Sequence, residues 1–366
     1  MNKQTMKKRI DINGKTILVT GSPGFIGANL VIRLLDEMSG GTVVSFDNMN
    51  GYYDVGLKEY RLSLIEAKVK ESPVDHVFIR GDLIDKVLID DIFDRYKPDI
   101  VVNLAAQAGV RYSIDHPQDY INSNIVGFFN ILEACRHSYD DGNTGVEHLV
   151  YASSSSVYGV NKKIPFSTED KVDDPVSLYA ATKKSCELIA HSYSKLYNIP
   201  STGLRFFTVY GPAGRPDMFY YSATQRLLND EKIRLFNYGD MKRDFTYIDD
   251  IVEGVYRVIK GAPERTMGDD ELPIPPYSIY NIGGGQPESL LDFVSTLQEE
   301  LVRSGLLDKD YDFEGHRELV GMQPGDVPVT YADCCALEED YGFTPGIGIR
   351  EGLRKFCEWY KEYYCR

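Results

Sequence analysis

The sequence predicts an α/β protein built on a doubly wound parallel sheet, with a smaller C-terminal lobe. Three observations lead to this prediction. Short β-branched runs alternate with amphipathic stretches through the first two-thirds of the chain, as in a sheet made of strand–helix units. A glycine-rich loop follows the first of these runs. Beyond about Arg205 the alternation gives way to loops rich in glycine and proline, and 366 residues exceed what one core usually holds.

The alternation places the individual elements. The predicted strands are Thr16–Thr20, Val43–Phe46, His76–Ile79, Ile100–Leu104, His148–Ala152 and Thr202–Phe206. The predicted helices are Phe25–Met38, Asp119–Cys135 and Leu178–Tyr197. In the first helix, apolar residues recur at helical spacing and so share one face, namely Ile26, Leu30, Leu34 and Met38.

The same pattern divides the chain. We expect one domain over residues 10–210 and a smaller second lobe over residues 211–366. The segment Asp244–Ile259 has the pattern of a strand end followed by a helix. We therefore expect the chain to return to the first domain near residues 244–260.

Composition excludes several classes of protein. With 40 Lys+Arg against 55 Asp+Glu the formal net charge is −15, which repels a phosphodiester backbone, so we expect no nucleic-acid partner. No run of about 18 apolar residues and no signal peptide is visible, so we expect no membrane association and a cytoplasmic location. The six cysteines lack the spacing of zinc ligands, so we expect reduced thiols and no metal site.

A Gly-x-x-Gly-x-x-Gly loop, at Gly21, Gly24 and Gly27, opens the first predicted helix. Its glycines permit a tight turn, a close approach of backbone to a diphosphate, and close packing of helix on strand, while the helix N-terminus supplies donors. Asp47 follows 20 residues after Gly27, at the end of the next strand, where a carboxylate binds the adenosine ribose and repels a 2′-phosphate. The sequence therefore predicts a Rossmann domain that binds NAD.

Two further strand ends are candidates for cofactor contacts. Asp82 and Leu83 follow the third predicted strand, where an acid can reach the adenine, although a solvated turn has the same pattern. Ala105, Ala106 and Gln107 follow the fourth predicted strand. Small residues at this place leave room for a bound cofactor, although they also suit ordinary packing against the sheet.

Tyr179 and Lys183 stand four residues apart in the predicted helix Leu178–Tyr197 and therefore share a face. A neighbouring ammonium and a cationic nicotinamide favour a phenolate, which can exchange a proton with a sugar hydroxyl while hydride moves to the cofactor. This pair alone is common by chance. Here, however, four consecutive hydroxyls, Ser153–Ser156, end the fifth predicted strand, at the edge where parallel sheets bind ligands.

Longer stretches resemble a known family. They are Phe46–Asp54, Leu57–Glu59, Ala105–Ser113, Leu204–Pro212 and Gly214–Met218. Together with the glycine loop and the Tyr179/Lys183 pair, they resemble the extended short-chain dehydrogenase/reductase superfamily. More narrowly, they resemble its NAD-dependent nucleotide-sugar epimerases, in particular the UDP-glucuronate 4-epimerases. The resemblance runs from about Lys15 to Trp359.

The resemblance implies an isomerase that interconverts UDP-glucuronate and UDP-galacturonate through a transient 4-keto sugar, with NAD taking and returning the C4 hydride. Tyr179 is then the base, Lys183 favours its phenolate, and Ser154 shares the proton of the 4-hydroxyl. Asn124 and Phe207 match positions beside the nicotinamide. The implied cofactor-binding set is Gly21, Gly24, Phe25, Ile26, Gly27, Asp47, Asn48, Asp82, Leu83, Ala105, Ala106, Gln107, Asn124, Tyr179, Lys183 and Phe207.

For the UDP part, the resemblance implies a diphosphate contact from Arg243 and a nucleotide-ribose contact from Asp326. Leu235 and Phe236 match the strand that contacts the uracil. A second diphosphate arginine of related epimerases is replaced by Gln323 here, and Arg215 is the candidate substitute.

The resemblance also makes Ser155 and Ser156 distinguish among sister reactions. It implies carboxylates at both positions in nucleotide-sugar 4,6-dehydratases, and a Glu at the position of Ser156 in UDP-glucuronate decarboxylases. A 4-keto glucuronate is a β-keto acid that loses CO₂ readily, so an epimerase must hold the carboxylate still. We expect Ser155, Ser156 and Thr208 to donate to it, with Arg111 at longer range. A UDP-glucose/UDP-galactose 4-epimerase is the nearest alternative, and a decarboxylase is a further one. A non-catalytic NAD-binding sensor is the alternative from another class.

The resemblance also implies a homodimer in which Asp119–Cys135 and Leu178–Tyr197 of each subunit form a four-helix interface. Apolar residues of the second helix would serve either this interface or the core. They are Leu188, Ile189, Tyr193 and Leu196.

Overall fold

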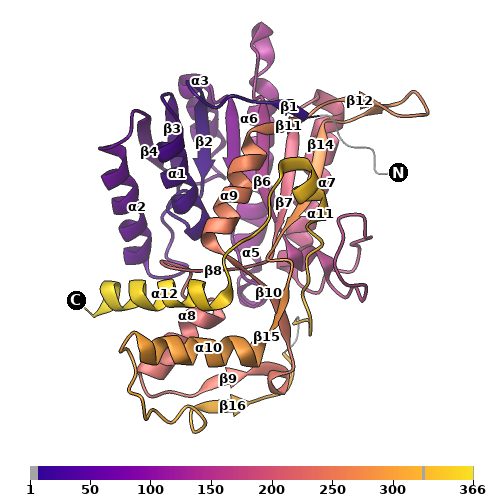
Figure 1. The fold of residues 1–366 in the computed structure, drawn as a ribbon. Coiled ribbons are helices and arrows are strands. Elements are labelled where there is room, and N and C mark those ends of the chain that lie inside the picture. Colours follow the sequence, from indigo (N-terminus) through magenta and orange to yellow (C-terminus); the bar gives the residue numbers. More distant parts are fainter. Residues whose placement is uncertain (1–6, 324–325, 366) are drawn as a thin grey trace.

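The computed structural model describes residues 7–323 and 326–365 and centres on a seven-stranded parallel sheet (Figure 1). The strand order is β14-β7-β6-β5-β2-β3-β4. In that order the bounds are Tyr277–Ile282, Ser201–Phe206, His148–Ser154, Ile100–Asn103, Thr16–Thr20, Thr42–Asp47 and Asp75–Arg80. All the predicted strands are confirmed, with ends shifted by no more than two residues.

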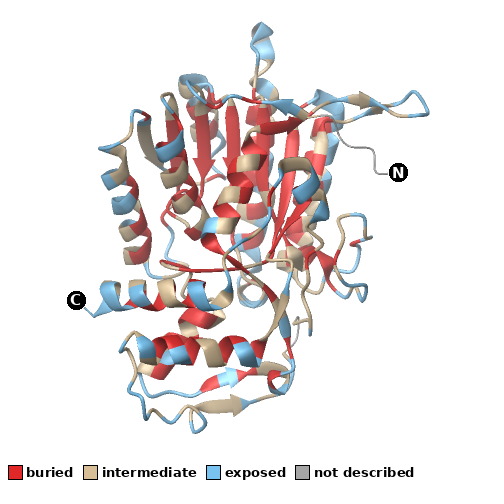
Figure 2. Ribbon diagram, in the orientation of Figure 1, coloured by how far each residue is buried: buried red, intermediate tan, exposed pale blue. Residues whose placement is uncertain are grey.

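Helices cover both faces of the sheet. Helices α1 (Phe25–Glu37), α2 (Val55–Val69) and α9 (Ile248–Ile259) pack together on one face, and α3 (Lys86–Tyr96), α6 (Phe128–His137) and α7 (Leu178–Tyr197) pack on the other. Strand β2 shows why two cores form. Ile17 and Val19 join the α1 and α9 core, whereas Leu18 joins the α3, α6 and α7 core, because successive strand residues point to opposite faces. The sheet is accordingly the most buried part of the molecule (Figure 2).

The predicted helix Asp119–Cys135 is three segments in the structure. A short α5 (Pro117–Tyr120) leads into a π-helix, Ile121–Gly127, and then into α6. Asn124 lies within the wider π turn, which commonly occurs at functional positions. There the Asn124 side chain bonds to the backbone of Gln107, so the irregularity has a specific local partner.

A smaller lobe lies beyond the carboxyl ends of the strands, in the lower part of Figure 1. Strand β10 (Lys242–Tyr247) pairs in parallel with β8 (Thr208–Tyr210) and antiparallel with β15 (Pro287–Ser289), and β9 (Ile233–Leu235) pairs with β16 (Arg317–Leu319). Its helices are α8 (Phe219–Leu228), η4 (Phe236–Gly239), α10 (Leu290–Arg303) and α12 (Ile349–Tyr364). The other elements are β1 (Lys7–Arg9), α4 (Tyr112–Asp115), η2 (Asp140–Gly142), η3 (Ser155–Tyr158), β11 (Gly261–Pro263), β12 (Thr266–Met267), β13 (Pro273–Ile274) and α11 (Cys335–Tyr341).

The chain returns to the sheet domain more than once, and two of these returns are α9 and β14. The expected return near residues 244–260 is the end of β10 and helix α9, which packs on α1. The second return, β14, comes from residues that the sequence assigned to the smaller lobe. It pairs in parallel with β7 from Tyr277 opposite Ser201 to Ile282 opposite Phe206, so a division of the chain at residue 210 misses one strand of the sheet.

Within the described ranges, none of the helices has the length and hydropathy needed to span a bilayer. In the same part of the chain, no three His, Cys, Asp or Glu side chains are grouped so that they could hold a metal ion.

Candidate active site

A cavity of about 500 Å³ opens at the carboxyl ends of the strands, between the sheet domain and the smaller lobe. It brings together most of the residues that the sequence singled out. Those on its wall are Gly21, Gly24, Phe25, Ile26, Gly27, Asp47, Asn48, Asp82, Leu83, Ala105, Ala106, Gln107, Ser154, Ser155, Ser156, Tyr179, Lys183, Phe207, Thr208, Arg215 and Asp326.

The glycine loop forms one wall of the cavity in a conformation that needs its glycines. Gly21 has φ of +72°, and a Cβ there would lie 2.7 Å from the Ala105 nitrogen, while a Cβ at Gly27 would collide with the Gly21 carbonyl. Helix α1 begins after Gly24 with no capping side chain and no acidic residue in its first turn. Its first N–H groups and partial positive charge are therefore available to an anion, which fits the diphosphate of a dinucleotide.

Asp47 ends strand β3 beside a lysine that sequence reasoning missed. The Asp47 Oδ1 accepts a hydrogen bond from the Met49 nitrogen at 2.7 Å and contacts Lys58 Nζ at 3.4 Å. Lys58 is only 5% exposed and also donates to Asn50 Oδ1 at 3.0 Å. Lys58 lines the cavity from α2, and no spacing in the sequence marked it.

Tyr179 and Lys183 reach the cavity from the first turns of α7. The helix begins at Leu178 because the Ser177 side chain caps it by accepting from the Ala180 nitrogen. Lys183 is 4% exposed, and its Nζ donates to the Ala152 carbonyl at 3.0 Å. This bond holds the ammonium at the end of β6, next to the serines.

Ser154 is the last residue of β6 and the start of a short turn. Its Oγ donates to Ser156 Oγ and accepts from the Ser156 nitrogen, both at 3.1 Å. Ser154, Ser155 and Ser156 line the cavity that Tyr179 also lines.

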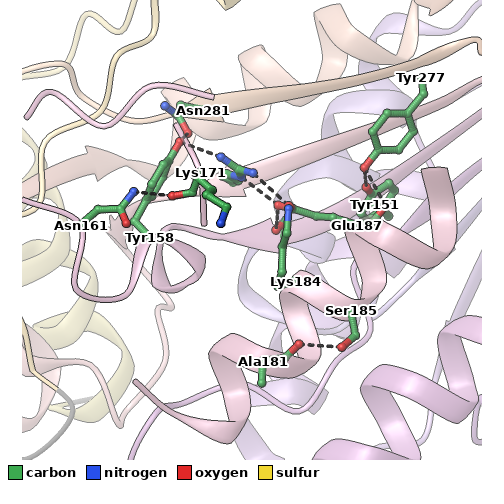
Figure 3. A network of polar contacts seen from close by, with 12 residues as sticks. Tyr151, Tyr158, Asn161, Lys171, Ala181, Lys184, Ser185, Glu187, Tyr277 and Asn281 are labelled. Carbon is green, nitrogen blue, oxygen red and sulfur yellow. Dashed lines mark hydrogen bonds and ion pairs between the residues drawn. The ribbon is translucent and has the colours of Figure 1, made fainter. Parts of the chain in front are cut away.

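A buried polar network around Glu187, which includes Tyr158 and Asn281 (Figure 3), begins one residue before Ser154, at Ser153. Ser153 Oγ donates to Glu187 Oε1 at 2.7 Å, and Arg205 donates to both oxygens of Glu187 at 2.8 and 2.9 Å. Arg205 also donates to the Tyr158 hydroxyl, which in turn donates to Asn281. Burial raises the pKa of Glu187, but the hydrogen bonds and charge of Arg205 outweigh burial and hold that pKa below its ordinary value.

Asn124 lies behind the cavity wall and is not among its lining residues. Its Oδ1 accepts from the Gln107 nitrogen at 2.8 Å, and its Nδ2 donates to the Gln107 carbonyl and to Thr182 Oγ1, both at 3.0 Å. Asn124 thus fixes the backbone at the end of β5 to helix α7. Tyr120, which sequence reasoning missed, packs edge-on against the Tyr179 ring with centroids 5.9 Å apart.

Three of the residues predicted for the nucleotide, Phe236, Arg243 and Asp326, form a group beside the cavity, here called the rim group. Arg111 contacts Asp326 at 3.4 Å, and its guanidinium lies 4.9 Å from the centre of the Phe236 ring. Burial lowers the pKa of Arg243, and the charge of Asp326 partly offsets that effect, which places these two residues within electrostatic range. Of these residues only Asp326 lines the cavity.

Two of these placements differ from the expectation. Arg111 belongs to the rim group because its charge is paired with Asp326, whereas the sequence placed it at longer range from the sugar carboxylate. The Leu235 side chain is fully buried in the small lobe, and its carbonyl accepts from the Val320 nitrogen at 3.0 Å. Its side chain is therefore part of a core and does not face the cavity.

Arg215 lines the cavity and is held in place by two residues that sequence reasoning missed. Asp217 accepts from Arg215 Nε at 3.0 Å and Nη2 at 2.5 Å, and it also accepts from the Tyr52 hydroxyl at 3.1 Å. Burial lowers the pKa of Arg215, but the charges of Asp217 and of Tyr179 raise it more, so the side chain stays a cation.

Comparison with known proteins identifies matching sequences and structures. The model of the NAD dependent epimerase/dehydratase family matches residues 17–283. Protein CapI of Staphylococcus aureus is 47% identical over 360 residues, covering 95% of this chain and 99% of that protein. The probable UDP-glucuronate 4-epimerase of Rhizobium meliloti (strain 1021) is 41% identical over 357 residues, which cover 95% of this chain and 98% of that protein. The crystal structure of a Bacillus cereus UDP-glucuronic acid 4-epimerase, in complex with UDP-glucuronic acid and NAD, matches with a TM-score of 0.79 and 30% sequence identity. The match covers 95% of this chain and 100% of that one.

Proposed function

The chain belongs to the NAD-dependent epimerase/dehydratase family, and from this premise we propose that it interconverts UDP-glucuronate and UDP-galacturonate by 4-epimerisation. The reaction is reversible, uses NAD and passes through a transient 4-keto sugar. Relatives named for this activity match almost the whole chain, which supports the assignment. The observation that carries it is one cavity that joins a diphosphate-type glycine loop to Tyr179, Lys183 and a wall of hydroxyls.

In the proposed mechanism, Tyr179 removes the proton of the sugar 4-hydroxyl. Lys183, held on the Ala152 carbonyl, keeps a positive charge beside the phenolate, and Ser154 shares the proton through its hydroxyl. NAD bound along the glycine loop supplies the acceptor and donor for the C4 hydride. Tyr179 then returns the proton to the sugar after its other face has turned toward the cofactor, so the reaction has no net redox change.

The glucuronate carboxylate needs partners that hold it without aiding loss of CO₂. Ser155, Ser156 and Thr208 line the cavity and present hydroxyl donors. Arg215 also lines the cavity, and we propose it as a further cationic contact for the sugar or its neighbouring phosphate. In the rim group, Arg243 and Asp326 are the candidates for the diphosphate and nucleotide ribose.

We propose that two copies associate through an apolar surface on α6, α7 and the preceding π-helix. This α6/α7 surface consists of Val126, Phe129, Leu188 and Leu196, which are 40%, 41%, 60% and 71% exposed. Ile189 and Tyr193 instead pack partly into the core. A second copy that presents the same surface would bury these side chains in a symmetric four-helix contact.

For the location of the protein, we propose the cytoplasm. All six cysteines are unpaired, as is usual in a reducing compartment.

The deciding experiment is to incubate the purified protein with UDP-glucuronate without added cofactor or reductant and to resolve the products by anion exchange with mass detection. UDP-galacturonate of unchanged mass is the expected product. A UDP-pentose, lighter by CO₂, would make the protein a decarboxylase and overturn the assignment of Ser155 and Ser156. Turnover of UDP-glucose without turnover of UDP-glucuronate would show that the substrate is a neutral sugar. The assignment of Ser155, Ser156 and Thr208 to a sugar carboxylate would then be wrong.

A further inference from the structure

Arg61 is a fully buried cation on helix α2 whose hydrogen-bonding partners are all neutral oxygens. It is 1% exposed. Its Nε donates to the Ala213 carbonyl and its Nη2 to the Gly214 carbonyl, both at 2.8 Å. Its Nη1 donates to the Pro23 carbonyl at 3.1 Å and to the Tyr53 hydroxyl at 2.7 Å. A buried guanidinium with this many directed bonds fixes the position of each acceptor.

The acceptors belong to two loops that are far apart in the sequence. Pro23 is part of the glycine loop on the cofactor side of the cavity. Ala213 and Gly214 form the turn that leads directly into Arg215, on the sugar side. One side chain on α2, which packs beside α1 at the edge of the sheet domain (Figure 1), thus joins the two walls of the site.

The second of these loops needs to be held. Ala213 has φ of +49°, a left-handed conformation that costs a residue with a Cβ about 1 kcal/mol. The next residue, Gly214, has no room for a Cβ because the Tyr220 hydroxyl occupies that space. The two bonds from Arg61 to this turn therefore contribute to the conformation that sets where Arg215 and its partner Asp217 lie.

The charge of Arg61 has a separate consequence on the cofactor side. Pro23 has no N–H, so the glycine loop offers one donor fewer to a diphosphate. A full positive charge bonded to the Pro23 carbonyl, away from solvent, acts through a medium of low polarity and makes the potential at this loop more favourable for an anion.

We propose that Arg61 is a positioning residue that couples the cofactor loop to the sugar-binding loop. Its charge strengthens retention of the dinucleotide, and its planar, forked geometry places Arg215 for the sugar. The sugar half of this inference rests on the proposed function, whereas the cofactor half depends only on NAD binding.

Two substitutions separate charge from geometry. Arg61→Lys keeps the charge but cannot make the forked set of bonds, and Arg61→Met removes both. The readouts are the amount of NAD released per subunit on denaturation, and the KM and kcat for UDP-glucuronate. For Arg61→Met we expect NAD content to fall and KM to rise about tenfold, as for loss of a hydrogen bond to a charged group. For Arg61→Lys we expect the same rise in KM with NAD content close to wild type.

Lys68→Met is the matched control. Lys68 lies on the same helix and pairs with Asp36 and Glu71, outside both loops, so both readouts should stay at wild-type values. If Arg61→Met does not fold, as judged by its thermal transition, Arg61→Lys still tests the geometric half, because it retains charge and most of the volume.

Three results would overturn the proposal. One is NAD content and KM within twofold of wild type in every folded Arg61 variant. A second is a change of only one of the two properties in Arg61→Met, because the loops would then not be coupled. The third is a loss of NAD in Arg61→Lys equal to that in Arg61→Met, which would exclude a role for the charge. If the wild-type protein does not turn over UDP-glucuronate, the proposed function fails, yet NAD content across the variants still decides the cofactor half.

Discussion

Glu187 and Arg205 form a bidentate ion pair that ties helix α7 to strand β7. The side chains are 1% and 2% exposed, and both oxygens of Glu187 are bonded to the guanidinium. Since Glu187 also accepts from Ser153, the pair joins the strand that ends in Ser154 to the helix that carries Tyr179 and Lys183. The relative position of Ser154, Tyr179 and Lys183, the proposed catalytic residues, therefore depends on a contact that none of them makes.

Glu187→Ala should lower the free energy of unfolding by about 3–5 kcal/mol, because it leaves Arg205 buried without its partner. Denaturant titration measures this change. Lys184→Ala provides the control, since it removes the partly exposed partner of the same carboxylate at 3.1 Å and should cost about 1 kcal/mol or less. Equal losses in the two variants would contradict the importance of the buried pair.

Acid should weaken the same contact. The pKa of Glu187 lies below its ordinary value of 4.5 in the folded protein, so the ionised form stabilises the fold above that pH. This stabilisation is lost as the pH falls below about 4.5 and through the lower folded-state pKa. Thermal transitions measured from pH 7 to pH 3 should fall more steeply for the wild type than for Glu187→Gln. Parallel curves would show that Glu187 does not gain a proton on unfolding.

Tyr179→Phe should lower kcat by about 10²–10⁴, because it removes the proposed base. The purified variant should retain its NAD, since the glycine loop and Asp47 are untouched. Product formation and cofactor content, measured on the same sample, test both statements. Turnover within tenfold of wild type would require a different base.

Thr208→Ala should raise the fraction of UDP-pentose formed from UDP-glucuronate, because one proposed donor to the carboxylate is lost and CO₂ can leave the 4-keto intermediate more easily. Product analysis by mass gives this fraction. Thr208→Ser, which keeps the hydroxyl, should behave like the wild type. An unchanged UDP-pentose fraction in the alanine variant would remove Thr208 from the carboxylate site.

Replacing Leu188 and Leu196 together by lysine should dissociate the proposed dimer, because two exposed apolar side chains of the α6/α7 surface become charged. Light scattering after size exclusion measures the mass in solution. Val87→Lys on α3 changes an apolar side chain that is 80% exposed outside this surface and should not alter the mass. A wild-type protein that is already monomeric would contradict the proposed assembly.

The sequence predicted the sheet well, and the glycine loop and Asp47 lie together on the cavity wall, for a physical reason. The strands from Thr16 to Phe206, the glycine loop and Asp47 are local patterns, in which a few neighbouring residues decide the structure. The π-helix around Asn124 was not predicted, because it depends on a partner at Gln107 and not on helical periodicity.

Contacts between segments that are distant in the sequence could not be predicted from its pattern either. Lys58 beside Asp47, Asp217 beside Arg215 and Tyr120 against Tyr179 become neighbours only when the loops of both lobes are in place. Nothing in the spacing of these residues distinguishes them from surface charges and aromatics. The resemblance to a known family pointed to residues on the cavity wall. It did not point to the side chains, such as Asp217, that bond to these residues and fix their positions.

Strand β14 has a consequence for how the protein is made. It begins at Tyr277 of a 366-residue chain, yet it covers the edge of β7 and supplies both Tyr277, which bonds to Tyr151, and Asn281, which bonds to Tyr158. A ribosome-bound chain that has emerged only as far as α9 therefore has an open sheet edge and an incomplete polar network behind its active site. The domain that binds the dinucleotide can finish folding only after most of the smaller lobe's strands have also been synthesised.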